Sequence, residues 1–299
     1  MKHYALNIGL DAKVARMTET STPTRTLKSA DGTPLAVWVS GAGPTVVLVH
    51  GTTSDHTTYD ELRPHLAQHR TVVTYDRRGR GASGDRDTYD FERELEDAAA
   101  VIDDAAERQG SPVDVFGHSF GAFVALGAAA YGSKVRAVVA YSPGFGAEYP
   151  DGALGRIEAA TASDDLDTAL QVMFAEIIGM PADEIEMMRQ SPVWPVRVAA
   201  AGTVARECRA DEGFLRNYAQ RLSELAVPVL VVDGATNTAP KRQISTDLSA
   251  ALPISRVLEM AGQGHVAHHI AASGLSDISL QFFGDPGSVP RGPAPVRQS

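Results

Sequence analysis

Cysteine is almost absent from this sequence, in which Cys208 is the only one among 299 residues. A single cysteine excludes an internal disulfide and any metal site built from several cysteines. It fits a reducing compartment and is interpreted as a small buried apolar residue. Long apolar runs are also missing, since no stretch approaches the roughly 18 residues of a membrane helix and residues 1–25 lack the apolar core of a secretion signal. We therefore predict a cytoplasmic protein without membrane contact.

Positive charge is scarce as well, with 27 lysines and arginines against 37 aspartates and glutamates and a formal net charge of -10 at pH 7. This balance repels a phosphate backbone, so nucleic acid is not an expected partner. Hydrophobic residues make up 43% of the chain and charged residues 21%, which is ordinary for a folded protein and excludes wholesale disorder. A small-molecule substrate is the expected partner, and the sequence leaves the oligomeric state open.

Short β-branched and aliphatic runs alternate with helical patterns along much of the chain. The runs expected to form buried strands are residues 45–49, 71–75, 113–116, 135–141, 227–232 and 255–260. The helical patterns are residues 59–68, 91–109, 119–130, 244–252 and 268–283. A turn at residues 30–34 also predicts a hairpin ahead of them. The alternation predicts an α/β fold, a mostly parallel, doubly wound sheet.

One long segment interrupts the alternation. Residues 143–226 contain no convincing buried strand but several helical pieces, which predicts a helical cap inserted between two strands of the sheet. The core is then expected in two stretches, 25–142 and 227–284. Residues 1–24 read as a loosely packed leader, and residues 285–299, with four prolines, as a disordered tail.

The clearest chemical signal is Gly117-His118-Ser119-Phe120-Gly121, which follows a predicted strand and opens a predicted helix. In a G-x-S-x-G turn at such a junction, the glycines relieve crowding and the serine hydroxyl stands exposed above the sheet. Ser119 is therefore the candidate nucleophile, and a purely structural turn is the alternative.

A second loop lies at His50-Gly51-Thr52-Thr53, after the predicted strand 45–49. A backbone N–H of Thr52 or Thr53, together with that of Phe120, could hold an oxyanion. We interpret His50 as a side chain that braces this loop.

The glycine- and arginine-rich loop at residues 76–84 lacks the lysine of a phosphate-binding P-loop. Its arginines Arg77, Arg78 and Arg80 are therefore expected to form structural ion pairs.

A histidine in a glycine-bracketed loop, His265, follows the last predicted strand. Parallel strands present their carboxyl ends at one edge of the sheet, so His265 can reach Ser119 and is the candidate general base. His268 and His269 are expected to be packing or surface residues. No metal site is predicted, because the three histidines lack a carboxylate at ligand spacing.

The series His50-Gly51, Asp76 to Gly81, Gly117 to Gly121 and Gly264-His265, in this order, resembles the α/β-hydrolase superfamily over about residues 25–283. The resemblance implies a serine nucleophile and a cap, and a mechanism with this nucleophile requires no metal or organic cofactor. Dehalogenases and epoxide hydrolases of the superfamily have aspartate where Ser119 stands, so those activities are disfavoured. Esterases, lactonases, thioesterases, carbon–carbon bond hydrolases and haloperoxidase-like enzymes remain.

The superfamily also implies a carboxylate that orients the histidine, and its usual positions here hold Asn237 and Ser142. Loss of this charge matters, because replacing the carboxylate by asparagine in a serine protease lowers turnover about 10⁴-fold. Asp233 is the first substitute, and Glu207 or Asp55 the second. In the third interpretation no carboxylate orients His265, and the protein is a slow hydrolase or catalyses another type of reaction.

The cap carries Met173, Met188 and Trp194 at mixed helical spacings. They are expected either to pack the cap or to line an apolar substrate pocket. The sequence thus predicts a serine hydrolase acting on a small apolar ester, lactone or thioester. A non-hydrolytic cyclase or lyase of secondary metabolism and a non-catalytic ligand-binding protein are the alternatives.

Overall fold

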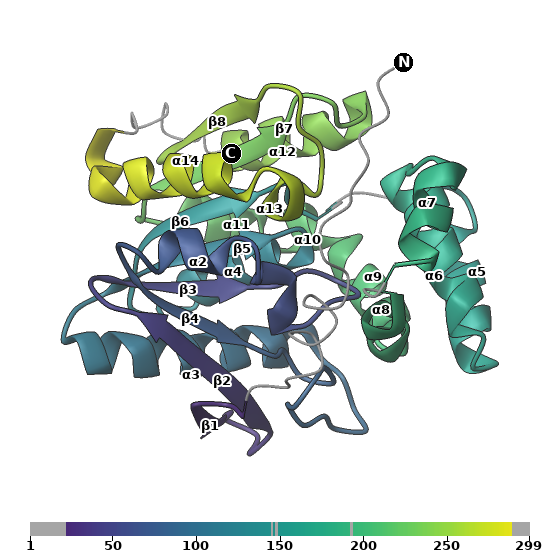
Figure 1. The fold of residues 1–299 in the computed structure, drawn as a ribbon, viewed down its shortest axis with the longest axis horizontal. Coiled ribbons are helices and arrows are strands. Elements are labelled where there is room, and N and C mark those ends of the chain that lie inside the picture. Colours follow the sequence, from purple (N-terminus) through teal and green to yellow (C-terminus); the bar gives the residue numbers. More distant parts are fainter. Residues whose placement is uncertain (1–21, 145, 147–148, 192–193, 289–299) are drawn as a thin grey trace.

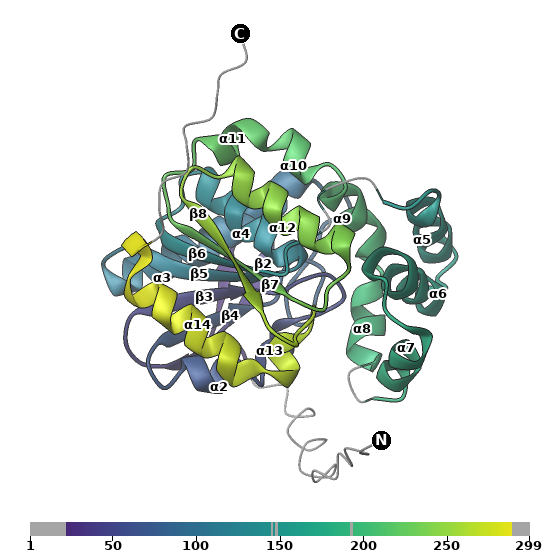
Figure 2. The ribbon, with the colours of Figure 1, turned by 90° about the horizontal axis from the view of Figure 1, so that it is seen from above.

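A computed structural model describes residues 22–288 except 145, 147–148 and 192–193. An eight-stranded sheet runs through its centre in the order β1-β2-β4-β3-β5-β6-β7-β8 (Figures 1 and 2). The strands are β1 (Arg25–Lys28), β2 (Pro34–Gly41), β3 (Thr45–Val49), β4 (Thr71–Tyr75), β5 (Val113–His118), β6 (Val135–Tyr141), β7 (Val229–Gly234) and β8 (Ser255–Met260). Strands β3 to β8 pair in parallel, while β2 pairs antiparallel with both β1 and β4. The α/β fold class is confirmed.

Helices cover both faces of the sheet, which explains why its central strands are apolar throughout. On one face lie α3 (Phe91–Gln109), α4 (Phe120–Ala130) and α12 (Ala239–Ala251), whose apolar side chains form one cluster with the strands. On the other face α2 (Arg63–Leu66) and α14 (Ala272–Gly284) contribute to a second cluster. Three shorter helices complete the core: η1 (His56–Tyr59), α13 (Ala267–Ile270) and η3 (Pro286–Ser288).

Two predicted helices differ from the observed ones, and a proline explains each difference. The single helix predicted over residues 59–68 is wrong: η1 ends at Tyr59, and α2 starts afresh with Pro64 in its first turn. A proline lacks the N–H that a continuous helix would need there. Pro240 similarly lies in the first turn of α12, which begins five residues before the predicted start at residue 244.

The helices between β6 and β7 form two groups. They are α5 (Ala153–Ala162), α6 (Leu166–Val172), η2 (Met173–Ile178), α7 (Ala182–Arg189), α8 (Trp194–Ala201), α9 (Val204–Asp211), α10 (Phe214–Asn217) and α11 (Ala219–Ser223). Side chains from Tyr149 to Cys208 form an apolar cluster of their own, and α5 to α8 stand beside the sheet (Figure 2). In contrast, Phe214 and Leu222 belong to the apolar cluster of the core. Only the first group packs as a separate unit.

Most of the predicted leader and tail, residues 1–21 and 289–299, lies outside the described residues. Within the described part of the chain, no helix has both the length and the apolar character needed to cross a membrane.

Candidate active site

Ser119 occupies a sharp turn between β5 and α4. Its φ of 56° and ψ of -128° lie in a region that non-glycine residues rarely adopt. Both flanking glycines are required by close approach. A Cβ at Gly117 would lie 2.5 Å from Ala122 Cα, and one at Gly121 would collide with the carbonyl of Val49. The sequence therefore folds into an elbow that presents the Ser119 hydroxyl.

Backbone donors lie beside this hydroxyl. Phe120 is the first residue of α4, where no helical carbonyl accepts its N–H. Thr52 lines the same pocket as Ser119, while Thr53 has a φ of 57° and a buried side chain. Of the two predicted alternatives for the second oxyanion donor, Thr52 is the one whose residue borders the pocket.

The loop that carries Thr52 is held by His50 and Arg77. The Nε2 of His50 accepts from the Arg77 N–H at 3.0 Å, and its Nδ1 lies 3.0 Å from the Gly51 carbonyl oxygen. An Arg77 guanidinium N–H donates to the same oxygen at 3.0 Å. The predicted bracing role of His50 is confirmed, since both ring nitrogens are used in the loop.

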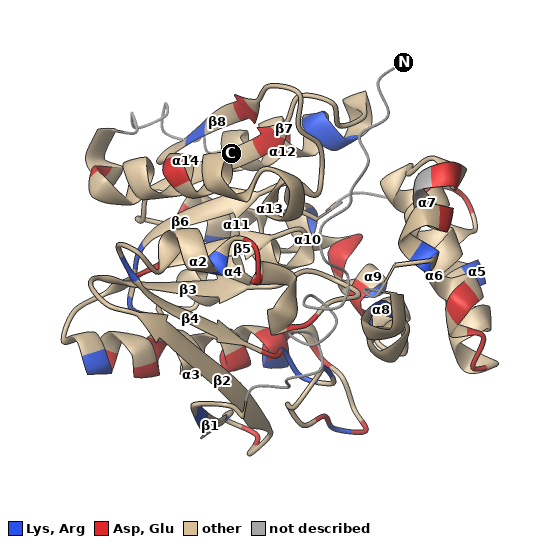
Figure 3. Cartoon of the chain, viewed as in Figure 1, with Lys and Arg blue, Asp and Glu red and all other residues tan. Residues whose placement is uncertain are grey.

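The arginines after β4 form the predicted ion pairs, and two of them connect core and insertion. Arg77 and Arg80 pair with Glu94 on α3 and with Glu207 on α9, and all four side chains are buried. Arg78 pairs separately with Asp97 and Asp31. In the view of Figure 3, basic residues lie interspersed with acidic ones on the core and on the insertion. Glu207 is thus committed to the arginines and does not serve His265.

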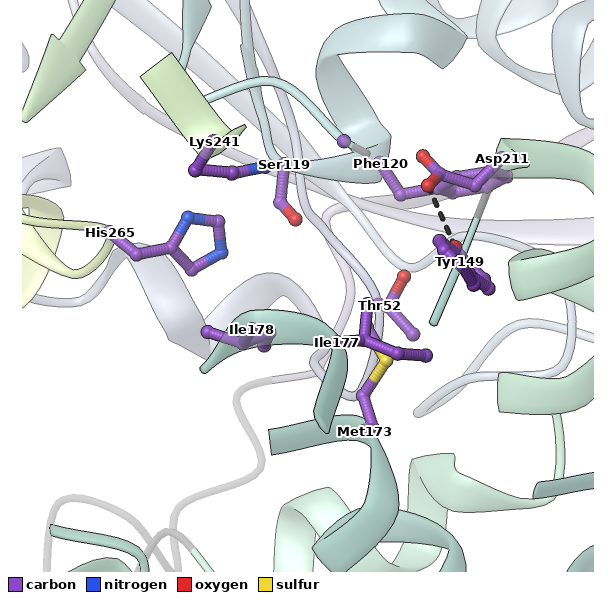
Figure 4. A pocket seen from close by; sticks show the side chains of 11 residues that line it. Thr52, Ser119, Phe120, Tyr149, Met173, Ile177, Ile178, Asp211, Lys241 and His265 are labelled. Carbon is purple, nitrogen blue, oxygen red and sulfur yellow. Dashed lines mark hydrogen bonds between the residues drawn. The ribbon is translucent and has the colours of Figure 1, made fainter. Parts of the chain in front are cut away.

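His265 is fixed in place by contacts to its loop. The Tyr141 hydroxyl donates to the Gly264 carbonyl at 2.5 Å and accepts from the Ala267 N–H at 2.7 Å. The His118 Nε2 lies 2.9 Å from the His265 carbonyl oxygen. The strands β5 and β6 therefore position the loop that follows β8, and the imidazole of His265 points into the pocket toward Ser119 (Figure 4). No hydrogen bond joins these two side chains among the described residues, as in many free enzymes.

Ser142 occupies one of the two positions at which the superfamily resemblance implies a catalytic carboxylate. Its Oγ lies 2.7 Å from His265 Nδ1 and accepts from the Asn237 amide at 3.2 Å. Asn237 in turn donates to Asp233 at 2.5 Å, and Asp233 also accepts from Ser245. The expectation that Asp233 contacts His265 is therefore corrected, because two side chains separate them. The other candidate, Asp55, caps η1 by accepting from the Thr57 N–H.

The Ser142 hydroxyl orients His265 but supplies no charge. A hydroxyl can donate to Nδ1 or accept from it, whereas a carboxylate only accepts and so fixes the tautomer whose Nε2 is free to take a proton. Burial lowers the pKa of His265 well below its usual value, and the neighbouring His118, Lys241 and Arg197 lower it further. The neutral imidazole is favoured, and its protonation during a reaction is disfavoured.

The pocket in front of Ser119 lies between the core and the insertion. Its apolar wall from the insertion is Met173, Ile177 and Ile178 (Figure 4). The prediction for Met173 agrees with this wall, but Trp194 and Met188 are not among the lining residues. Trp194 packs 6.2 Å from Phe174 between ring centroids, and Met188 packs against the same apolar cluster of the insertion.

Three polar lining residues had no sequence signal: Lys241, Asp211 and Tyr149. The Tyr149 hydroxyl donates to Asp211 at 2.7 Å, and Asp211 also accepts from the Gly146 N–H. Lys241 was hidden because Pro240 made its segment resemble a loop, whereas it lies in the first turn of α12. The pocket is therefore more polar than the sequence suggested.

One group of described side chains has its ligand atoms close enough together for a metal ion, namely Asp55, His56 and Asp76. The buried Asp76 already accepts from the His56 and Ala82 N–H groups and lies 2.7 Å from His56 Nδ1. These bonds account for the cluster as a structural network.

Buried histidines predict a loss of stability in mild acid. Burial lowers the pKa of His118 to about 3 and those of His50 and His268 well below the usual value. Below about pH 6.5 these histidines bind protons in the unfolded chain but stay neutral in the folded chain. The free energy of unfolding therefore falls as the pH decreases toward 3. His118 alone should cost about 2 kcal/mol at pH 5.

Urea unfolding at several pH values measures this effect. His118→Gln should flatten the pH dependence by about one proton, while His69→Gln, at an exposed position, is the matched control. Equal slopes for the wild type and His118→Gln would contradict the assignment.

Comparisons with known proteins identify the fold family. A family model described as alpha/beta hydrolase matches residues 46–276. A solved alpha/beta hydrolase from Sphaerobacter thermophilus is 34% identical, with a TM-score of 0.76 over 87% of this chain and 100% of that one.

Two of the similar sequences have names that state an activity. A 2-(acetamidomethylene)succinate hydrolase from Mesorhizobium japonicum is 27% identical over 79% of this chain and 87% of its own. A pimeloyl-[acyl-carrier protein] methyl ester esterase from Neisseria meningitidis is 28% identical over 79% of this chain and 92% of its own.

Proposed function

The chain belongs to the α/β-hydrolase family. From this premise we propose that it is an ester hydrolase in which Ser119 and His265 hydrolyse a small ester, lactone or thioester with a largely apolar body. The observation that carries the proposal is that Ser119, at the strained elbow, and His265 line one pocket whose far wall is apolar. No metal or organic cofactor enters this mechanism.

The proposed steps are those of a serine nucleophile with a histidine base. Ser119 Oγ attacks the substrate carbonyl carbon while its proton passes to His265 Nε2. The N–H groups of Phe120 and Thr52 hold the oxyanion, and the imidazolium then gives its proton to the departing oxygen or sulfur. Water, activated by the same imidazole, releases the acyl group from Ser119.

A second candidate function rests on Ser142. Without a carboxylate at His265 Nδ1, the imidazolium is poorly stabilised, and hydrolysis should be slow. The same pocket, oxyanion donors and neutral base are sufficient for a cyclisation or lyase reaction that never forms an acyl-enzyme.

A fluorophosphonate probe tests the primary proposal. We expect it to modify the wild-type chain once, on the peptide that contains Ser119, and Ser119→Ala to remain unmodified. Ser83→Ala, which removes a serine from the structural loop after β4, is a control that should retain labelling.

A panel of aryl and alkyl esters completes the test. Turnover above the uncatalysed rate that disappears in Ser119→Ala supports hydrolysis. Labelling without turnover favours the cyclase or lyase function, and the absence of both would leave ligand binding alone.

A further inference from the structure

We propose that the acyl part of the substrate carries a free carboxylate, which binds the ammonium group of Lys241. The inference rests on the proposed function and specifies its substrate class as a monoester or monothioester of a dicarboxylic acid. The apolar wall formed by Met173, Ile177 and Ile178 would contact the chain between the two carbonyl groups.

Lys241 is a cation without an ion-pair partner in the part of the chain that the structure describes. It is one of only five lysines in the sequence, it is partly buried, and it borders the pocket together with Ser119 and His265. Its ammonium donates to the Pro143 carbonyl, which occupies one of its three N–H groups. Among the described residues no carboxylate lies within ion-pair distance of it. A cation that is partly withdrawn from water is costly unless an anion completes its surroundings.

The charge persists near neutral pH. Burial lowers the pKa of Lys241 to about 8, and the more distant carboxylates of Asp211 and Asp233 oppose that decrease. Most molecules therefore hold an ammonium, not an amine, at pH 7. Figure 4 shows this side chain extending toward Ser119 from α12, so a ligand at Ser119 lies within its reach.

A second cation, Arg197, adds to the positive charge near His265. Arg197 on α8 donates to Thr53 Oγ1 at 3.0 Å, its buried Nε has no hydrogen-bond partner, and no described carboxylate pairs with it. Arg197 and Lys241 both lie near enough to His265 to lower its pKa. These two cations add positive charge near His265 in a protein whose net charge is -10.

The opposite side orients the substrate. In Figure 4, Asp211 and Tyr149 lie across Ser119 from Lys241 and His265. The Asp211 carboxylate repels a second carboxylate, so the free end of the acyl group is directed toward Lys241. A dicarboxylic monoester therefore has one favoured orientation.

Binding of the carboxylate also affects the chemical step. A negative charge beside Lys241 offsets the positive field at His265 and makes its protonation easier. Ser142 supplies no such charge, so the substrate would provide part of what a catalytic carboxylate supplies elsewhere. A free carboxylate on the substrate should accordingly increase kcat and not only decrease KM.

Matched substrates test the inference in the wild-type protein. Monomethyl succinate, glutarate and adipate are compared with the corresponding carbamoyl methyl esters, which have the same shape without the charge. We expect at least one acid to exceed its amide about 10- to 100-fold in kcat/KM. Differences below about twofold in all three pairs, with turnover otherwise intact, would overturn the inference while the proposed function stands.

Variants assign the effect to Lys241. Lys241→Met should remove the preference for the acid, Lys241→Arg should restore much of it, and Lys28→Met, at an exposed position on β1, should retain it. Folding of each variant is checked by thermal unfolding, so that a misfolded chain is not read as a loss of preference.

A binding measurement separates the two hypotheses. Succinate, glutarate or adipate should raise the unfolding temperature of Ser119→Ala but not that of Ser119→Ala/Lys241→Met. Binding without any ester turnover would refute the hydrolase function and leave the carboxylate site in place. If none of the three dicarboxylates binds and none of the monoesters is preferred, the carboxylate site is refuted.

Discussion

Replacing Ser142 with aspartate is expected to raise kcat about 10²- to 10³-fold. The gain should be smaller than the roughly 10⁴-fold effect of the corresponding charge in a serine protease, because this site is built around a shorter side chain. The new carboxylate would accept from His265 Nδ1–H, fix its tautomer and stabilise the imidazolium. Position 142 has a φ of 41°, which aspartate tolerates better than most residues, and Asn237 remains as a donor.

Ser142→Asn is the matched control, since it has nearly the same size and no charge. It should not increase kcat. The two variants should also differ in pH dependence, because a carboxylate raises the pKa of His265 and activity requires the neutral base. The acid limb of kcat/KM should therefore move to higher pH in Ser142→Asp only, measured between about pH 5 and 8. An increase of equal size in both variants would show that charge is not what His265 lacks.

Glu207→Gln should destabilise the protein by about 3–5 kcal/mol. Arg77 and Arg80 are buried and share Glu94 and Glu207 as their anions. Removing one anion leaves an uncompensated cation in the interior. The free energy of unfolding, from urea denaturation at neutral pH, measures the loss.

Glu158→Gln is the control for this variant. Glu158 also belongs to the insertion and pairs with an arginine, but Arg209 is 71% exposed. Such a pair contributes only about 0–1 kcal/mol. Similar losses for Glu158→Gln and Glu207→Gln would contradict the importance assigned to the buried cluster.

Local patterns predicted the elements that local chemistry determines. Strands β3, β4, β6 and β8 and helix α3 have the predicted bounds, and the caps of α3 are visible in the sequence as Asp90 and Gly110. Two prolines caused errors in the predicted helices. Pro64 divides a segment that was predicted as one helix, and Pro240 lies in the first turn of a helix that was predicted to begin later. Because of the second error, the sequence analysis did not place Lys241 on a helix beside the pocket.

The candidate site was likewise predictable only where local sequence marks it. Ser119 and His265 are each marked by glycines in the adjacent sequence. The resemblance pointed to positions 142 and 237, but which side chain contacts His265 could not be found in this way. Ser142 lies 123 positions from His265 and 95 from Asn237, and the three meet only when the strands of the sheet pair. Long-range contacts of this kind have no signature in a single sequence.

The division of the inserted helices determines where a chimaera can be joined. The apolar contacts of residues 149–208 are made largely within that stretch. A foreign cap grafted there should therefore leave the apolar side chains of the core buried. A graft that continues to residue 226 would replace Phe214 and Leu222, which belong to the apolar cluster of the core. The donor must also supply a carboxylate at the position of Glu207, because Glu94 alone cannot compensate the charges of both Arg77 and Arg80.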